Sequence, residues 1–194
     1  MRLFLAALLG AVAMFVWLML AHMFTPLGEA GIDYLPGEDA VSAALTSSVG
    51  SRPGMYMFPT GGLTKGVSQE EQEKGMERMM EEMKTKPSGL LIYKPAGTTF
   101  NFARCLAIEF LTDFAIALIA VFLLAQTRIV TYAGRVGFVT LVGVLAAISA
   151  NVPHWNWYGF SSTYAAANIF MAIVAMFFAG LVIAAIYKPA ATQR

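Results

Sequence analysis

The residues best suited to chemistry in this sequence are two carboxylates inside a long apolar segment. Glu109 and Asp113 are four positions apart, so on an α-helix they share one face. An ionised side chain costs about 2.5–3.5 kcal/mol at the centre of a membrane-spanning helix. Carboxylates in such a place bind a ligand, handle a proton or form a hydrogen-bonded staple between helices. The sequence leaves the site and staple interpretations open.

The two carboxyl groups should differ in charge. At a rise of about 1.5 Å per residue, Asp113 lies about 6 Å further along the helix than Glu109. Desolvation and a neighbouring negative charge favour the neutral acid, so we expect Asp113 to be the protonated member at neutral pH unless a cation reaches it. We expect Glu109, nearer to water, to stay charged and to pair with a cation. The candidate cations are His22, His154 and Arg104.

Polar residues near one end of each apolar segment can join this pair in a single pocket. They are His22, Thr112, Ser149, Asn151, His154 and Asn168. The two histidines and two carboxylates suit a divalent metal, the histidines alone suit a haem, and the donor fork of Arg104 suits a quinone or a lipid headgroup. None of these has a specific spacing signature, so the sequence assigns no metal site and no cofactor. The alternative is that the histidines are hydrogen-bonded anchors at the membrane interface.

Four apolar segments must position these side chains. The chain is 58% hydrophobic and only 13% charged, which is too apolar for an ordinary soluble domain. We therefore predict an all-α membrane protein, a four-helix transmembrane bundle with a small extracytoplasmic α+β insertion between the first two helices. The predicted spans are residues 1–24, 103–125, 136–152 and 165–187, with Pro153 ending the third. The first has a long apolar core and is expected to be an uncleaved signal anchor.

Residues 25–102 form the only extended polar part and are predicted to be an α+β cap. A short helix begins near Glu38, and strands are expected at residues 55–58 and 90–93. Between them, Ser68 and Glu71 fit a capping box at the start of a helix over residues 68–86. We expect the two strands to pair, with this helix as the crossover between them.

The helix over residues 68–86 carries a methionine face. Met76, Met79, Met80 and Met83 follow the spacing of one apolar helix face. Thioethers are soft ligands that suit Cu(I), so a copper site is one interpretation. We favour the other, a pliable apolar face that rests on the cap or on the membrane surface.

Several function classes are excluded or disfavoured by what the sequence lacks. The single cysteine, Cys105, excludes an intrachain disulfide and a dithiol reaction within the chain. No basic patch indicates a nucleic-acid partner. Thr140 is the one polar side chain in the halves of the spans remote from Glu109 and Asp113, whereas a channel or transporter needs polar groups through the full depth.

The distribution of charge predicts the orientation. Lys and Arg in short loops and ends mark the cytoplasmic side. One side of the predicted bundle carries Arg2, Arg128, Arg135, Lys188 and Arg194 and no acidic residue, whereas all 12 carboxylates belong to the other side. Both termini should therefore be cytoplasmic and residues 25–102 periplasmic in a bacterial inner membrane. Trp155, Trp157 and Tyr158 then lie at the outer interface as anchors.

Four stretches carry a resemblance to known sequences. They are GIDYLPGEDAV, GMYMFPTGG, GLLIYKPAG and PHWNWYGF. Together they resemble a set of uncharacterised small bacterial integral membrane proteins. The resemblance implies the four-span layout and a bacterial envelope, and it implies no activity.

The sequence therefore supports two classes of function. The first is a non-catalytic inner-membrane accessory or scaffold protein with an outward-facing polar pocket, whose partners are the lipid bilayer and another membrane or periplasmic protein. The second is a metal-, haem-, quinone- or lipid-binding membrane protein. The candidate ligand-binding or proton-handling residues are His22, Arg104, Glu109, Asp113, His154 and Asn168.

Overall fold

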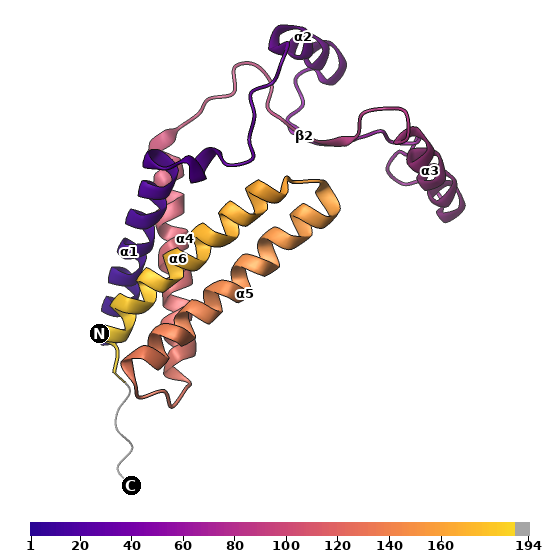
Figure 1. Cartoon of the computed structure of the whole chain (residues 1–194). Helices are drawn as coiled ribbons and strands as arrows, with labels where there is room; N and C mark the ends of the chain where they lie inside the picture. The colour runs from indigo at the N-terminus through magenta and orange to yellow at the C-terminus, as the bar shows by residue number, and fades with distance from the viewer. Residues whose placement is uncertain (189–194) are drawn as a thin grey trace. The chain divides into compact units, whose positions relative to one another are not determined.

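The computed structural model describes residues 1–188, which are mostly helical with one small sheet. Four helices are long and apolar enough to cross a membrane, which indicates a membrane protein. They are α1 (Arg2–Phe24), α4 (Phe102–Ala125), α5 (Tyr132–Tyr158) and α6 (Ser162–Ile186) (Figure 1). The chain forms two compact units, a bundle built from residues 1–33 and from 100 onward, and an insertion, Tyr34–Thr99.

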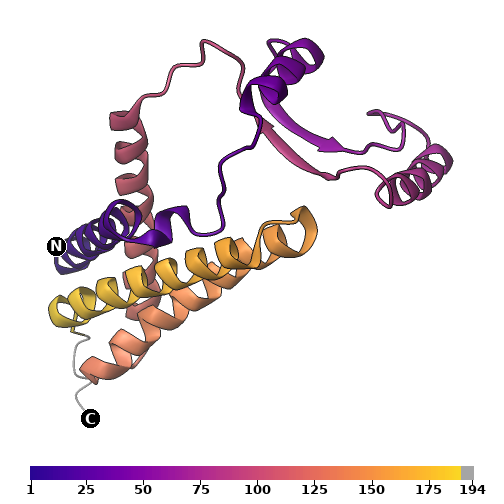
Figure 2. The same cartoon turned by 45° about the horizontal axis from the view of Figure 1, so that its top comes forward.

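Helix α6 lies between α1 and α5 and packs along both, and α1 also packs along α4 (Figure 2). Helices α4 and α5 touch only sparsely. The core is built largely from small side chains, because these let helix backbones approach closely in a bilayer. It includes Ala6, Ala7, Ala11, Ala117, Ala120, Ala175 and Ala179, with Val121, Leu124, Val139 and Ile183 between them.

The small residues of α5 only partly behave as close-contact positions. Gly143 lies against α6, where an added Cβ would come within 2.4 Å of the Met176 Cβ. Ala147 is also buried, but Gly137, Ala146 and Ala150 are exposed. These positions differ in burial because α5 packs extensively along α6 and only sparsely along α4.

Helix α5 continues through Pro153, contrary to the prediction that it ends there. A proline inside a helix removes one hydrogen bond and crowds the preceding turn. The last turn is nevertheless held, since the Trp155 Nε1 donates to Ser162 Oγ at 3.0 Å. Gly159 then ends the helix with φ 74°, a left-handed conformation that glycine adopts readily. Trp155, Trp157 and Tyr158 are thus helical.

The end of the bundle that holds the α4–α5 connection is closed by Arg135. This side chain is 4% exposed. Its Nη1 donates to the Val130 carbonyl at 2.6 Å, and its Nη2 donates to the Ala184 carbonyl at 2.9 Å. The second bond satisfies a carbonyl in the last turn of α6, where intrahelical partners run out and a cation is favourable. We call this the loop end of the bundle.

The insertion contains α2 (Glu38–Val49), β1 (Gly54–Phe58), α3 (Gln69–Glu82) and β2 (Gly89–Tyr93). The predicted strands do pair, and the Ser68–Glu71 capping box is confirmed. The strands are antiparallel, however, with Met55 opposite Ile92. A crossover joins parallel strands, so that part of the prediction is wrong, and α3 lies within a long hairpin connection.

The methionine face of α3 is largely uncovered within the insertion. Gly75 is the buried residue of this helix, and Leu63 packs directly over it. Met79 is partly buried, whereas Met76, Met80 and Met83 are exposed. The expectation that this face rests on the cap itself is therefore wrong, and contact with a membrane surface stays a prediction.

Candidate functional site

All four long helices contribute to one pocket at the end of the bundle opposite the loop end. Here α1 and α5 end, and α4 and α6 begin, and we call it the insertion end. The pocket has a volume of about 330 Å³. Its polar lining residues are His22, Glu109, Thr112, Asp113, Asn151 and Asn168. The apolar ones are Met14, Leu18, Ile116, Gly143, Ala146, Met171, Ala172, Ala175 and Met176.

Asp113 is the polar residue of this insertion-end pocket that is both buried and left with an unpaired oxygen. It lies near the middle of α4 and is only 2% exposed. Its Oδ2 is buried and has no hydrogen-bond partner among the described residues. Leaving a buried polar group unpaired costs about 1–3 kcal/mol, and more for a charged group. An unpaired buried carboxyl oxygen that lines a cavity makes Asp113 the strongest candidate in the pocket for contact with a partner from outside the chain.

The other polar side chains of the pocket bond to their own helices. The donors of Thr112, Asn151 and Asn168 bond to the carbonyls of Ile108, Ala147 and Tyr164, each at 2.9 Å. The Nδ1 of His22 lies 2.9 Å from the Leu18 carbonyl. A carbonyl oxygen only accepts, so this nitrogen carries the proton and Nε2 is left free. Every one of these bonds spans four residues, which is one helical turn.

Glu109 forms the rim of the pocket and is exposed. Together with His22 it also lines a neighbouring pocket of about 280 Å³, which contains Cys105. The predicted pairing of Glu109 with a cation is wrong for the described residues, because the three ion pairs found in residues 1–188 all lie in or just after α3. They are Lys74–Glu70, Lys84–Glu81 and Lys86–Glu82.

Two of the six predicted site residues do not reach the pocket. The ring of His154 stacks on Phe160, with ring centroids 5.2 Å apart. Arg104 is exposed in the first turn of α4, where its backbone N–H donates to the Asn101 Oδ1 at 2.9 Å. The two histidines therefore do not line this pocket together as a haem would require. Among residues 1–188, no group of three or more His, Cys, Asp or Glu side chains is arranged to hold a metal ion.

The apolar lining of the pocket was not singled out from the sequence. Gly143 leaves the space that a side chain would fill at the α5–α6 contact. On α6, a regular stripe runs from Asn168 through the pocket-lining residues that follow it at helical spacing. That spacing was readable in the sequence, but it could not be assigned to a pocket before the partner helices were known. The stripe is Asn168, Met171, Ala172, Ala175 and Met176.

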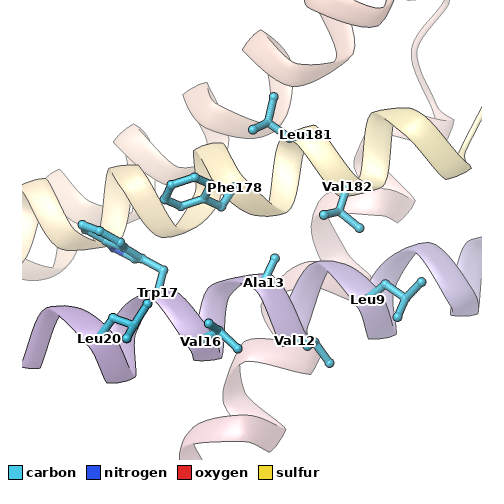
Figure 3. A pocket seen from close by; sticks show the side chains of 9 residues that line it. All are labelled: Leu9, Val12, Ala13, Val16, Trp17, Leu20, Phe178, Leu181 and Val182. Atoms are coloured by element: carbon cyan, nitrogen blue, oxygen red, sulfur yellow. The ribbon is translucent and has the colours of Figure 1, made fainter. Parts of the chain in front are cut away.

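A larger groove between α1 and α6 has a different character (Figure 3). It has a volume of about 620 Å³ and is lined by Leu9, Val12, Ala13, Val16, Trp17, Leu20, Phe178, Leu181 and Val182. The one polar atom among these side chains, the Trp17 Nε1, donates to the Met171 carbonyl at 3.0 Å. The groove therefore offers hydrocarbon contact and no unsatisfied polar group. The groove thus differs from the insertion-end pocket, whose lining includes two carboxylates.

In comparisons with known proteins, no protein-family model, no curated protein and no solved structure matches the chain.

Proposed function

We propose that this chain is a non-catalytic accessory protein of a bacterial inner membrane that binds a small ligand in its insertion-end pocket. The observation that supports this most strongly is Asp113, which is 2% exposed and has an unpaired oxygen. The pocket around it receives side chains from all four helices. Intramembrane carboxylates face bundle interiors or cavities and by default indicate ligand or proton sites, and the burial of Asp113 against a cavity supports this assignment.

Binding without translocation fits the remainder of the bundle. Toward the loop end, the buried core between the helices consists of Ala, Val, Leu and Ile side chains, with the partly buried rings of Phe114, Phe138 and Tyr187 packed against it. Thr140 bonds to the Val136 carbonyl at 2.9 Å and so offers no donor to a passing ligand. The guanidinium of Arg135 donates to two backbone carbonyls through Nη1 and Nη2, which leaves its Nε as the one donor of this group without a partner among the described residues. A conduction path would need free polar groups through this depth.

The proposed orientation follows the charges. Arg2, Arg128, Arg135 and Lys188 belong to the loop end, and the predicted Arg194 lies outside the described residues. By the positive-inside rule the loop end is cytoplasmic. The insertion is then periplasmic, α1 is a signal anchor, and the pocket takes its ligand from the periplasmic side. A reporter active only outside the cytoplasm should work when fused after Gly62 and fail after Thr131.

The binding function is tested by filling the pocket. Ala146 lines it and is exposed to it, so Ala146→Phe should occupy the cavity while leaving helix contacts in place. Val12→Phe places the same side chain in the apolar groove and is the matched control. Native mass spectrometry of gently purified protein should show a small-molecule adduct with the wild type and with Val12→Phe, and none with Ala146→Phe. An adduct retained by Ala146→Phe, or absent from the wild type, would contradict the proposal.

The scaffold function, in which the insertion or a helix face binds another membrane or periplasmic protein, is a separate proposal. Crosslinking in native membranes tests it. A partner captured equally by the wild type and by Ala146→Phe supports a scaffold role that is independent of the pocket.

A further inference from the structure

We infer that the insertion-end pocket recognises a primary ammonium group carried on an apolar body, an inference that rests on the ligand-binding function proposed above. Most hydrogen-bond donors of the polar residues in the pocket are already used within the chain. The donors of His22 and Thr112 are already bonded to backbone carbonyls of their own helices. The amides of Asn151 and Asn168 have each used one of two N–H groups in the same way.

What these residues retain is mostly acceptor capacity. Four groups keep free lone pairs, and the two carboxylates accept hydrogen bonds when ionised. A ligand that fits must therefore donate hydrogen bonds. A primary ammonium group has three N–H donors and no acceptor, which matches this inventory. The four groups are the Nε2 of His22, the Oγ1 of Thr112 and the Oδ1 atoms of Asn151 and Asn168.

Charge points to the same ligand. Glu109 and Asp113 both line the pocket, and no Lys or Arg does. Neither carboxylate has an ion-pair partner in the described part of the chain. A cation on the ligand would supply the missing counter-charge in a place where screening by water is weak. A quinone or an anionic headgroup brings acceptors instead, and only the second amide hydrogens of the two Asn side chains would remain for them.

The apolar residues that line the pocket indicate the apolar part of the ligand. Leu18, Ile116 and three methionines form the apolar wall. Methionine side chains are flexible and adapt to the shape of an apolar group. A volume of about 330 Å³ is at the small end of ligand pockets. The ligand is thus a short apolar amine, or the ammonium end of an aminophospholipid.

The test compares probes that share an alkyl chain. Protein in uncharged-lipid nanodiscs of phosphatidylcholine is titrated with decylamine, decyltrimethylammonium and decanoate, and thermal stabilisation gives the apparent Kd. We expect decylamine to bind at least tenfold more tightly than the quaternary ion, which has charge but no N–H donor, and decanoate to show no saturable binding. Equal binding of decanoate, or of the quaternary ion, would overturn the inference.

Two variants keep the test specific to the pocket. Asp113→Asn retains the shape of the side chain and should weaken decylamine at least tenfold, and Glu109→Gln at the exposed rim should weaken it less. Val12→Phe in the apolar groove should bind decylamine as the wild type does. Unchanged decylamine binding in both Asp113→Asn and Glu109→Gln would show that the amine binds elsewhere.

Failure of the inference and failure of the proposed function give different results. If Ala146→Phe removes the adduct but decylamine does not compete for it, the pocket binds a ligand of other chemistry and the inference is wrong. If no adduct exists and no probe binds, the proposed function is wrong. Nanodiscs that contain phosphatidylethanolamine decide whether the ammonium group belongs to a lipid or to a free amine. Competition between this lipid and decylamine identifies a lipid headgroup, and no competition identifies a free amine. Both outcomes support recognition of a primary ammonium group.

Discussion

Two ionisable side chains are buried in the described part of the bundle, and their surroundings differ. Arg135 at the loop end is 4% exposed, and both of its terminal nitrogens donate to backbone carbonyls, although its Nε has no partner. Asp113 at the insertion end is 2% exposed and makes no hydrogen bond to the described residues. A buried charge whose partners lie in the chain stabilises the fold. A buried acid without partners inside a cavity is a candidate binding group.

We expect the largest loss of stability from substitution of Arg135. Arg135→Ala removes two hydrogen bonds from a charged donor, each worth about 1.5–3 kcal/mol, and leaves the Ala184 carbonyl unpaired. We expect a loss of about 3 kcal/mol or more in the free energy of unfolding, measured by denaturation in mixed micelles. Arg135→Lys should recover part of it, because one cation still reaches the end of α6. A change below about 0.5 kcal/mol in Arg135→Ala would mean that the buried arginine is not structural.

Asp113→Asn should give the opposite pattern. The carboxyl group has no partner to lose, so the free energy of unfolding should stay the same or rise by up to about 1 kcal/mol. Recovery of the co-purified adduct should fall sharply, because the charge that holds the ligand is gone. Denaturation and native mass spectrometry of one preparation measure both. A stable variant that keeps its adduct would remove Asp113 from the site, and a loss of stability above about 2 kcal/mol would make it a staple.

We expect the smallest effect at the ion pair between Glu82, the last residue of α3, and Lys86, which follows the helix. The hydrogen bond from the Lys86 ammonium, 2.9 Å away, holds the pKa of Glu82 below its usual value. A lowered pKa stabilises the folded form at pH values above the unfolded pKa, and this stabilisation is lost as the pH falls through the lowered value. Glu82→Gln should therefore speed amide exchange at the end of α3 slightly at pH 7 and not at pH 2. An effect that grows at acid pH would contradict this sign.

Local signals in the sequence predicted much of the architecture. The four long helices follow from uninterrupted apolar runs, and the start of α3 follows from the capping box at Ser68. Features that depend on contacts between distant residues were missed. Arg135 was read only as a topology signal, because its carbonyl partner Ala184 lies 49 residues away. The end of α5 was misplaced because the bond that holds the turn after the proline joins Trp155 to Ser162, the first residue of α6, and this bond could not be read from the apolar pattern.

The candidate site also contains residues that the sequence predicted correctly and residues that it did not. His22, Glu109, Asp113 and Asn168 were predicted and all line one pocket. Arg104 precedes Asp113 by nine residues, which is about two and a half helical turns, so it points away from the pocket. This was readable from helical geometry. The position of His154 was not, since it depends on the continuation of α5 and on stacking with Phe160.

The proposal requires an insertion-end pocket that water reaches from outside the cell and that favours cations. It is tested by replacing Cys105 with Ser and introducing Ala146→Cys, or Ile148→Cys as the control on the same helix. Ala146 lines the pocket, whereas Ile148 is exposed on α5 and does not. Intact cells are then treated with membrane-impermeant methanethiosulfonates, one cationic and one anionic, and the labelling rates are compared.

We expect the thiol at position 146 to react from outside, about tenfold faster with the cationic reagent, because carboxylates raise the local concentration of cations. Adding Asp113→Asn should reduce this ratio, and we expect the thiol at position 148 to face lipid and to react slowly with both reagents. Equal slow labelling at the two positions, or an anionic reagent as fast as the cationic one at position 146, would contradict the account.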